Sequence, residues 1–209
     1  MAEPLALIDY GAGNLHSVKN ALVAAGAESV MVTADPELVR MAKRVVLPGV
    51  GSFRACFEGL TAIEGLVDAI EDRVLCDGVP FLGICVGMQL LASRGLEFGE
   101  CPGLGWIKGE VRPIERTDPA IKIPHMGWND VIRSAHHDGS ELIEPGEAYF
   151  LHSYHFVPDD GQHVAAMTDH GGGLVAAVAR DNLLGVQFHP EKSQAYGLGL
   201  LKRFLEWQP

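Results

Sequence analysis

Paired cysteines, basic runs and long apolar segments are scarce in this sequence of 209 residues. Its cysteines are Cys56, Cys76, Cys85 and Cys101, and no two of them form a C-x-x-C pair. The pattern therefore predicts free thiols in a reducing cytoplasm rather than a disulfide framework. Residues 1–10 contain no basic region and no long apolar stretch, and no apolar run approaches the length of a membrane span. Neither a signal peptide nor a membrane helix is expected.

Positive charge is also in short supply. The formal net charge is −11 and the isoelectric point is about 5.2, so a nucleic-acid or anionic-membrane partner is not expected. Hydrophobic residues make up 47% of the chain, which is enough for a sizeable core. The sequence has no linker, low-complexity segment or internal repeat, and its length fits one domain, so a single domain over residues 1–209 is predicted.

The first half of the chain alternates apolar runs with helix-like patterns. Asp35 and Pro36 are typical of the start of a helix, as N-cap and first helical residue. This alternation predicts an α/β fold with a mostly parallel sheet and helices on both faces. The predicted strands are residues 5–10, 28–34, 44–49 and 80–85, and the predicted helices are residues 15–25, 35–42, 63–74 and 86–95.

The second half is rich in strand-like segments separated by turn signals. These segments predict a mixed or antiparallel extension of the same sheet, followed by a last helix near residues 196–207. The predicted strands are residues 105–114, 148–157, 163–169, 174–180 and 183–190.

The stretch LGICVGMQLL, residues 82–91, places a thiol where a strand passes into a helix. Cys85 lies between Gly83 and Gly87 in the pattern G-x-C-x-G, which is typical of a nucleophile elbow. The glycines leave room for a sharp turn, the helix N-terminus favours the thiolate, and the backbone amide of Val86 can face an oxyanion. A buried structural cysteine packed among small residues is an equally good interpretation of this stretch alone.

Two further stretches carry groups that such a nucleophile needs. In GVQFHPEKS, residues 185–193, His189 ends an apolar strand and Glu191 follows two residues later, as a base and its orienting carboxylate would. In LPGVGSF, residues 47–53, glycines allow a backbone N–H to point into a site. A surface turn and an ordinary glycine-rich loop are the structural alternatives.

Taken together, GICVGMQ, HPEKS and LPGVGSF resemble the class I glutamine amidotransferases, over nearly the whole chain. IDYGAGN at residues 8–14 and PHMGWN at residues 124–129 resemble the branch of that family that serves histidine biosynthesis. The resemblance implies a flavodoxin-like sheet, no cofactor and no metal. Val86 departs from the leucine usual in the family, but this position lends mainly its backbone.

The resemblance also implies residue roles. Cys85 would attack the side-chain amide of glutamine, His189 would protonate the leaving ammonia and then activate water, and Glu191 would orient His189. The backbone oxyanion donors would come from Val86 and from Gly49 and Val50. The implied glutamine-binding residues are Gln89, Glu97, His152, Ser153 and Tyr154.

A partner is implied by the same resemblance. Ammonia released into water would be lost, so the histidine branch of the family would pass it to a cyclase subunit, a (β/α)₈ barrel, within a heterodimer. The positions that match this interface are Asn14, Trp128, Tyr149 and Lys192.

Other motifs are interpreted as structural. GAGNLH, residues 11–16, mimics a dinucleotide loop, but His16 stands where the third glycine belongs. His152 and His155 are expected on opposite faces of one strand, and His136 and His137 in a polar loop, so no zinc spacing emerges. Residues 171–173 predict a hairpin turn.

Three alternative functions stay open at this stage. One is another cysteine hydrolase on the same sheet, such as a γ-glutamyl hydrolase or a DJ-1-like protein. The second is a catalytically silent subunit that only binds a partner. The third is the glutaminase subunit of another synthase, such as that of pyridoxal phosphate synthesis.

Overall fold

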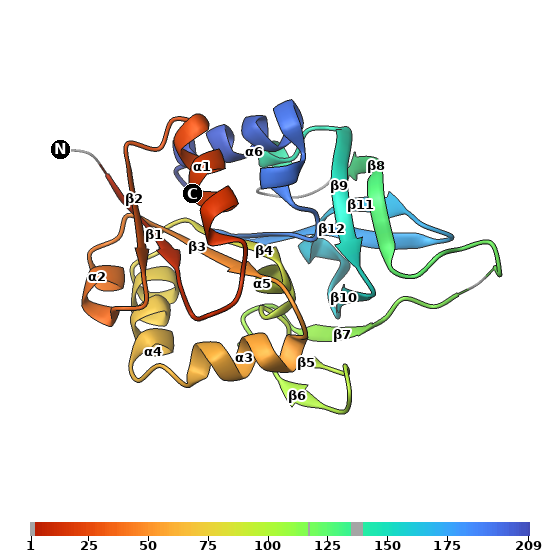
Figure 1. The fold of residues 1–209 in the computed structure, drawn as a ribbon, viewed down its shortest axis with the longest axis horizontal. Coiled ribbons are helices and arrows are strands. Elements are labelled where there is room, and N and C mark those ends of the chain that lie inside the picture. The colour runs from red at the N-terminus through yellow and green to blue at the C-terminus, as the bar shows by residue number, and fades with distance from the viewer. Residues whose placement is uncertain (1–2, 117, 135–139) are drawn as a thin grey trace.

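A nine-stranded mixed sheet forms the centre of the computed structural model, which describes residues 3–116, 118–134 and 140–209 (Figure 1). Its strand order is β2-β1-β3-β4-β13-β12-β11-β8-β9, and a second sheet has the order β10-β7-β5-β6. The predicted α/β fold with an antiparallel C-terminal extension is confirmed. His136 and His137 lie outside the described residues.

The N-terminal half builds the parallel part of the large sheet. Strands β1 (Pro4–Ile8), β2 (Ser29–Thr33), β3 (Arg44–Gly49) and β4 (Phe81–Cys85) pair in parallel, each close to its predicted range. The connections carry helices α1 (Leu15–Ala24), α2 (Pro36–Arg40), α3 (Phe53–Thr61) and α4 (Leu66–Glu71), and α4 continues into a π-helical turn, Asp72–Cys76.

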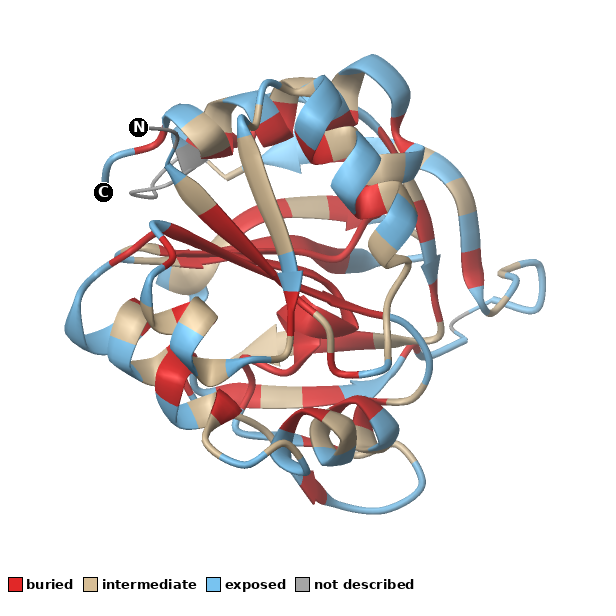
Figure 2. Ribbon diagram, turned by 60° about the vertical axis from the view of Figure 1, so that its left-hand side comes forward, coloured by how far each residue is buried: buried red, intermediate tan, exposed pale blue. Residues whose placement is uncertain are grey.

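Helix α2 begins as its sequence predicts. The side chain of Asp35 accepts a hydrogen bond of 2.9 Å from the backbone N–H of Glu37, and Pro36 occupies the first helical position. Helices cover both faces of the sheet. Helix α1 lies beside the last helix, α6 (Gln194–Glu206), on one face, and α2, α3 and α4 lie on the other (Figure 1). The strands between them are largely buried (Figure 2).

The C-terminal half extends the sheet from β4. Strand β13 (Leu183–Val186) pairs in parallel with β4, and β12 (Gly173–Arg180), β11 (Val164–Asp169), β8 (His125–Arg133) and β9 (Gly146–His152) continue it in antiparallel fashion. The turn before Gly173 joins β11 to β12 as the predicted hairpin. Strand β8 was not predicted, because its apolar residues do not alternate along HMGWNDVIR.

The predicted strand over residues 148–157 is wrong as a single strand. The chain changes sheets at Ser153, so β9 ends at His152 and β10 (Tyr154–Pro158) pairs with β7 (Gly109–Pro113) in the second sheet. An apolar run of this kind looks continuous in sequence, because both of its halves contain buried residues.

The predicted helix over residues 86–95 is wrong beyond its first turn. Helix α5 spans only Val86–Gln89, and β5 (Arg94–Gly95) then pairs with β6 (Cys101–Pro102). The carbonyls that a longer helix would use are taken by distant amides instead: Leu104 N, Ile107 N and Gly105 N donate to Leu90 O, Leu91 O and Ala92 O at 2.8, 3.0 and 2.9 Å. No helix within the described residues is long and apolar enough to cross a membrane.

Candidate active site

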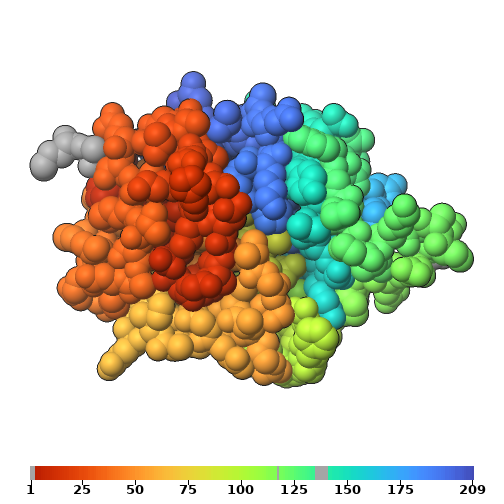
Figure 3. Space-filling model, viewed as in Figure 1, coloured from red at the N-terminus to blue at the C-terminus, as the bar shows by residue number. Residues whose placement is uncertain are grey.

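A cavity of about 300 Å³ opens at the carboxyl edge of the large sheet. Parallel strands present their carboxyl ends on one side, and this edge is where open α/β sheets bind ligands. Both halves of the chain contribute to the cavity, and these halves meet side by side over one face of the molecule (Figure 3). The lining residues are Val50, Gly51, Cys85, Val86, Gln89, Glu97, Pro124, Leu151, His152, Ser153, Tyr154, His189 and Lys192.

Cys85 sits on a sharp turn between β4 and α5. Its φ of 55° and ψ of −110° are unusual for a residue with a side chain, and such strain is characteristic of functional turns. The neighbouring glycines make the turn possible: a Cβ on Gly83 would lie 2.6 Å from Gly87 O, and a Cβ on Gly87 would lie 1.9 Å from Leu47 O. Because α5 has only four residues, the expected support of the thiolate by a helix N-terminus is weaker than the sequence suggested.

The sulfur of Cys85 is almost enclosed, with the residue only 4% exposed. Gln187 Nε2 donates to Sγ at 3.6 Å, and Leu151 O lies 4.0 Å from Sγ. The imidazole of His189 lies close enough to interact electrostatically with Cys85. Three different groups of the C-terminal half therefore surround a sulfur supplied by the N-terminal half.

His189 and Glu191 form a buried pair beside Cys85. His189 Nδ1 lies 2.8 Å from Glu191 Oε1, and both side chains are almost inaccessible to solvent. Burial acts to lower the pKa of His189, but the hydrogen bonds with Cys85 and Glu191 outweigh it and raise the pKa to about 9. At neutral pH the imidazole is therefore protonated.

Strand β9 holds the turn that carries this pair. His189 N donates to Tyr149 O at 2.9 Å, and Tyr149 N donates to Ser193 Oγ at 2.9 Å. The Ser193 hydroxyl in turn donates to His189 O at 2.7 Å. These bonds fix both ends of the segment from His189 to Ser193, so the histidine has little freedom to turn away from the sulfur.

Two side chains donate hydrogen bonds to backbone carbonyls of the glycine-rich loop after β3. Tyr10 Oη donates to Pro48 O at 2.7 Å, and Cys56 Sγ donates to Val50 O at 3.4 Å. Burial raises the pKa of both Tyr10 and Cys56, so both stay neutral donors at physiological pH. Between the two fixed carbonyls lies the Gly49–Val50 peptide, beside Cys85 in the β3–β4 register.

Gln89 and Glu97 line the cavity and also make internal bonds. Gln89 Nε2 donates to Tyr154 O and to Gln187 Oε1, each at 3.0 Å. Glu97 Oε2 accepts a bond of 2.8 Å from Phe53 N at the start of α3. Each residue therefore has one oxygen that is not used in these bonds and can serve the cavity.

His152 belongs to a short relay of hydrogen bonds behind the cavity. Asp169 O can only accept, so the Asn129 atom that lies 2.7 Å from it must be the amide nitrogen, Nδ2. The same nitrogen lies 3.0 Å from His125 Nε2 and donates its second hydrogen there. His125 Nδ1 then carries the proton and donates to His152 Nε2 at 2.9 Å. His152 Nδ1 donates to Tyr154 O at 2.8 Å. The relay thus assigns one tautomer to each histidine.

Both histidines of the relay are neutral. Burial lowers the pKa of His125 to about 4 and that of His152 to about 3. His155 was expected on the opposite face of the same strand as His152, but the two lie in different sheets, on β10 and β9. The described residues contain no group of three or more His, Cys, Asp or Glu side chains placed to hold a metal ion.

Three of the four positions matched to a partner interface lie close to one another. Trp128 on β8 pairs with Tyr149 on β9, with ring centroids 6.2 Å apart, and Lys192 Nζ lies 5.9 Å from the centre of the Tyr149 ring. Asn14 precedes helix α1, which packs against the Pro190–Lys192 turn. Lys192 is the member of this group that also lines the cavity.

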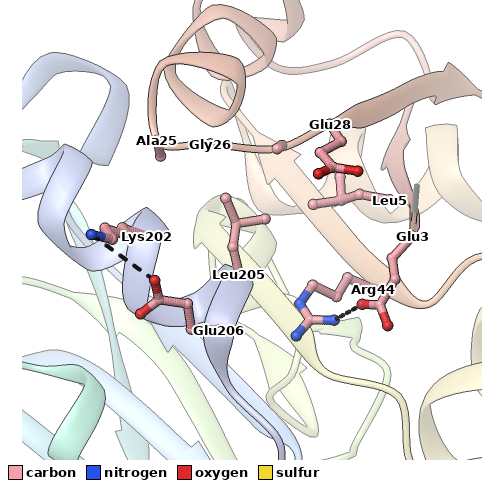
Figure 4. A pocket seen from close by; sticks show the side chains of 10 residues that line it. Glu3, Leu5, Ala25, Gly26, Glu28, Arg44, Lys202, Leu205 and Glu206 are labelled. Carbon is pink, nitrogen blue, oxygen red and sulfur yellow. Dashed lines mark hydrogen bonds and ion pairs between the residues drawn. The ribbon is translucent and has the colours of Figure 1, made fainter. Parts of the chain in front are cut away.

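A second, larger cavity of about 410 Å³ lies at the amino edge of the sheet, near the starts of β1 and β3 (Figure 4). Its lining includes Arg44, whose guanidinium is already bonded to Glu3 and to the carbonyls of Phe204 and Trp207. The lining contains no thiol and no histidine. Its chemistry does not match a nucleophilic site, although its volume is greater.

Sequence reasoning missed two residues that the structure places at the site. Gln187 contacts the sulfur, and Ser193 fixes the histidine turn. Gln187 had a visible signal: it is a polar residue inside an apolar run, two positions before His189, and alternate residues of an extended chain share a face. Ser193 had no such signal in the sequence, because its role depends on the hydrogen bond that it accepts from Tyr149 on β9.

Comparison with known proteins places this geometry in context. The family model "Glutamine amidotransferase class-I" matches residues 6–206. The chain is 59% identical to the imidazole glycerol phosphate synthase subunit HisH of Zymomonas mobilis subsp. mobilis, covering 98% of this chain and 96% of that protein. It is 53% identical to the HisH subunit of Rhodospirillum rubrum, with 98% and 99% covered.

Solved structures of lower identity share the fold. A structure described as a glutamine amidotransferase superposes with a TM-score of 0.73 at 21% identity, covering 96% of this chain and 97% of that one. PurLQS from Thermotoga maritima also gives 0.73, at 19% identity, with 99% and 98% covered.

Proposed function

The chain belongs to the class I glutamine amidotransferase family, and from this premise we propose how its residues perform the reaction. It hydrolyses glutamine to glutamate and ammonia for histidine biosynthesis, as the glutaminase subunit of an imidazole glycerol phosphate synthase. The observation that carries the residue roles is the meeting of Cys85, on its strained turn, with the buried His189–Glu191 pair.

In the first half of the reaction, Cys85 Sγ attacks the side-chain carbonyl carbon of glutamine. The carbonyl electrons move to oxygen, and the resulting oxyanion collapses to a thioester as the C–N bond breaks. His189 gives its proton to the departing nitrogen, which leaves as ammonia. Glu191 keeps the Nε2 side of the ring turned toward the reacting atoms, because its carboxylate holds Nδ1 at 2.8 Å.

In the second half, neutral His189 takes a proton from water and the hydroxide adds to the thioester. The carbon–sulfur electron pair returns to Cys85, and glutamate leaves. We assign the oxyanion donors to the backbone of Val86 and of the Gly49–Val50 peptide, which flank Cys85 on two sides of the turn.

We assign glutamine recognition to Gln89, Glu97 and the segment from His152 to Tyr154, all of which line the cavity. Glutamine carries an ammonium and a carboxylate at its α-carbon. Gln89 and Glu97 offer oxygens to the ammonium, since the amide nitrogen of Gln89 is already bonded to Tyr154 O and Gln187 Oε1. His152 is neutral and fixed by its relay, so it shapes the pocket without adding charge.

The partner we propose is a cyclase subunit, a (β/α)₈ barrel that forms a heterodimer with this chain. It joins the ammonia to a ribulosyl substrate and yields imidazole glycerol phosphate and aminoimidazole carboxamide ribotide. An exposed apolar patch supports this docking face: Met126, Trp128 and Leu151 are 65%, 47% and 37% exposed, and Leu151 also lines the cavity. The β8–β9 register sets Met126 opposite Leu151 and Trp128 opposite Tyr149, so the patch is continuous.

We also propose that the partner switches the glutaminase on. The Gly49–Val50 peptide lies between two pinned carbonyls, and Gly51 has a φ of 105° that favours glycine. A carbonyl turned toward the oxyanion would remove one donor, which costs roughly 10²–10³ in rate. Glutamine hydrolysis by the chain alone, with the cyclase, and with the cyclase and its ligand should therefore rise in that order. Equal rates in all three would remove the switch.

The test of the residue roles is Cys85→Ala in the complex with the cyclase. We expect it to abolish synthesis from glutamine and to leave synthesis from added ammonium salts intact, because the cyclase does not need the thiol. Retained glutamine turnover would exclude Cys85 as nucleophile. Loss of both activities would point to a failure of folding or assembly, which circular dichroism and co-purification detect separately.

A further inference from the structure

We propose that Gln187 is a catalytic residue: its side-chain amide donates a hydrogen bond to Cys85 Sγ and stabilises the sulfur as a thiolate. This inference rests on the proposed function, in which Cys85 is the nucleophile. Gln187 Nε2 lies 3.6 Å from Sγ, and the residue is fully buried, directly after β13. A donor placed in this way contacts the reacting atom itself.

The orientation of the Gln187 amide is set by a main-chain carbonyl, Tyr154 O, to which it is linked through two successive hydrogen bonds. A carbonyl can only accept, so Tyr154 O requires the NH₂ end of Gln89 at 3.0 Å. That NH₂ group also faces Gln187 across 3.0 Å and requires an oxygen there. Gln187 must therefore present its oxygen to Gln89 and its NH₂ group to Cys85. The reversed amide would set two donors against each other and leave the sulfur facing an oxygen.

The remaining neighbours of the sulfur do not replace this donor. Leu151 O, at 4.0 Å, can accept from a thiol but repels a thiolate. Tyr10 and Cys56, which both interact electrostatically with Cys85, are kept neutral by burial. The charged groups nearby are His189, backed by Glu191, and then Glu97 and Lys192 in the cavity lining. Gln187 and His189 are thus the two donors that the described residues direct at the sulfur.

The two donors have different tasks. His189 must surrender its proton to ammonia, so its charge changes during every turnover. The amide of Gln187 keeps its protons at every working pH, so its hydrogen bond is present whenever the sulfur carries negative charge. That condition holds before the attack on glutamine and again when the thioester breaks and the electron pair returns to sulfur.

The test measures how fast Cys85 in the full chain is alkylated by iodoacetamide as a function of pH, with the modified residue identified by peptide mass mapping. Only a thiolate reacts, so the rate reports the charged sulfur without requiring glutamine. Gln187→Met matches the length of the side chain but has no N–H donor. We expect its alkylation midpoint to move up by about one pH unit, and its rate below the midpoint to fall about tenfold, the usual size of a hydrogen bond to a charged group.

Two further variants make the test decisive. Gln162→Met places the same substitution at an exposed position and should give the wild-type profile. Gln187→Asn keeps an amide on a side chain that is one methylene shorter, so the amide no longer reaches the sulfur and the alkylation midpoint should shift in the same direction. This variant replaces Gln187→Met if Gln187→Met does not fold. An unchanged midpoint in a folded Gln187 variant overturns the role of Gln187. Failure of the proposed function looks different: Cys85 of the wild-type chain would then show no thiolate reactivity at neutral pH, and Cys85→Ala would remain active.

Discussion

The two halves of the molecule position their proposed catalytic groups by different physical means. In the parallel N-terminal half, Cys85 is placed by steric exclusion, because backbone atoms leave no room for a Cβ at Gly83 or Gly87. In the C-terminal half, His189 is placed by hydrogen bonds with Tyr149, Ser193 and Glu191. A backbone turn locks one strained conformation of the nucleophile, whereas hydrogen bonds leave the base able to exchange protons.

The halves meet where β4 runs parallel to β13. Ile84 is registered with Val186, so the next residues of the two strands, Cys85 and Gln187, emerge side by side at the carboxyl edge. Parallel pairing in register therefore brings two distant parts of the sequence to one point. If steric placement serves the nucleophile and hydrogen bonding serves the base, substitutions in the two halves should fail in different ways.

The largest effect is expected from the base. His189→Ala should lower kcat for glutamine hydrolysis in the complex by about 10³–10⁴, because both the acid and the base steps lose their proton carrier. Glu191→Ala should cost less, about 10²-fold, since it orients the ring without exchanging protons itself. Both variants should fold, and steady-state kinetics with a thermal melt will check this. A His189→Ala variant as active as wild type would remove the histidine from the mechanism.

Substitutions that add a side chain at the Cys85 turn in the N-terminal half should instead destabilise the fold. Gly87→Ala sets a Cβ 1.9 Å from Leu47 O, and the atoms that it meets belong to the backbone of β3, which cannot move easily. We therefore expect a loss of about 3 kcal/mol or more in the free energy of unfolding. Gly161→Ala is the control, because its Cβ meets no atom within 4 Å. Urea denaturation compares the two, and a Gly87→Ala chain as stable as Gly161→Ala would show that the elbow does not need its glycine.

A finer test of the N-terminal half addresses the loop that carries the oxyanion donor. Tyr10→Phe removes the 2.7 Å bond to Pro48 O, so the Gly49–Val50 peptide should be less well placed. We expect kcat to fall about tenfold, a fraction of the loss for a whole oxyanion donor, with KM for glutamine little changed. Tyr196→Phe removes a 2.8 Å tyrosine-to-carbonyl bond to Glu144 O outside the cavity and should leave kcat unchanged. Equal kcat values for the two variants would rule out a positioning role for Tyr10.

The difference between the parallel N-terminal half and the C-terminal half also explains how much of the fold could be predicted from the sequence. The parallel strands are short, largely apolar runs followed by turn or helix-start signals, so β1 to β4 were predicted closely. Strand β8 and the break at Ser153 were not, because their positions depend on pairing with segments far along the chain. Helix α5 stops early for the same reason: Leu104, Gly105 and Ile107 take the carbonyls that a local pattern assigns to a helix.

The candidate site was predictable where a motif fixes local geometry. The roles assigned to Cys85, His189 and Glu191 came from two short stretches, and the structure brings their side chains together. The amide of Gln187 and the hydroxyl of Ser193 required knowledge of which strands are neighbours. A contact whose direction depends on another contact, as Gln187 depends on Gln89 and Tyr154, cannot be derived from spacing along the chain.

The smallest expected effect concerns a buried group that the catalytic site does not use. His155 on β10 is 8% exposed, and its Nδ1 is buried without a hydrogen-bond partner among the described residues. Burial, and then the nearby Arg112, lower its pKa to about 4. The unfolded chain, with a histidine pKa of about 6.5, therefore binds the proton first as the pH falls. The neutral histidine contributes stability above pH 6.5, and that contribution is lost as the pH falls toward 4.

His155→Leu should remove this pH dependence, because leucine has a similar size and does not titrate. At pH 7.5 the free energy of unfolding should be unchanged or slightly higher, since an unpartnered polar atom leaves the core. Between pH 7.5 and 5.5 the variant should lose about 1 kcal/mol less than wild type. The slope that remains includes His125 and His152, whose pKa values are also lowered, and His189, whose raised pKa acts in the opposite direction. His16→Leu, at an exposed position on α1, is the matched control. Parallel curves for wild type and His155→Leu in urea titrations across this range would show that His155 does not couple protonation to folding.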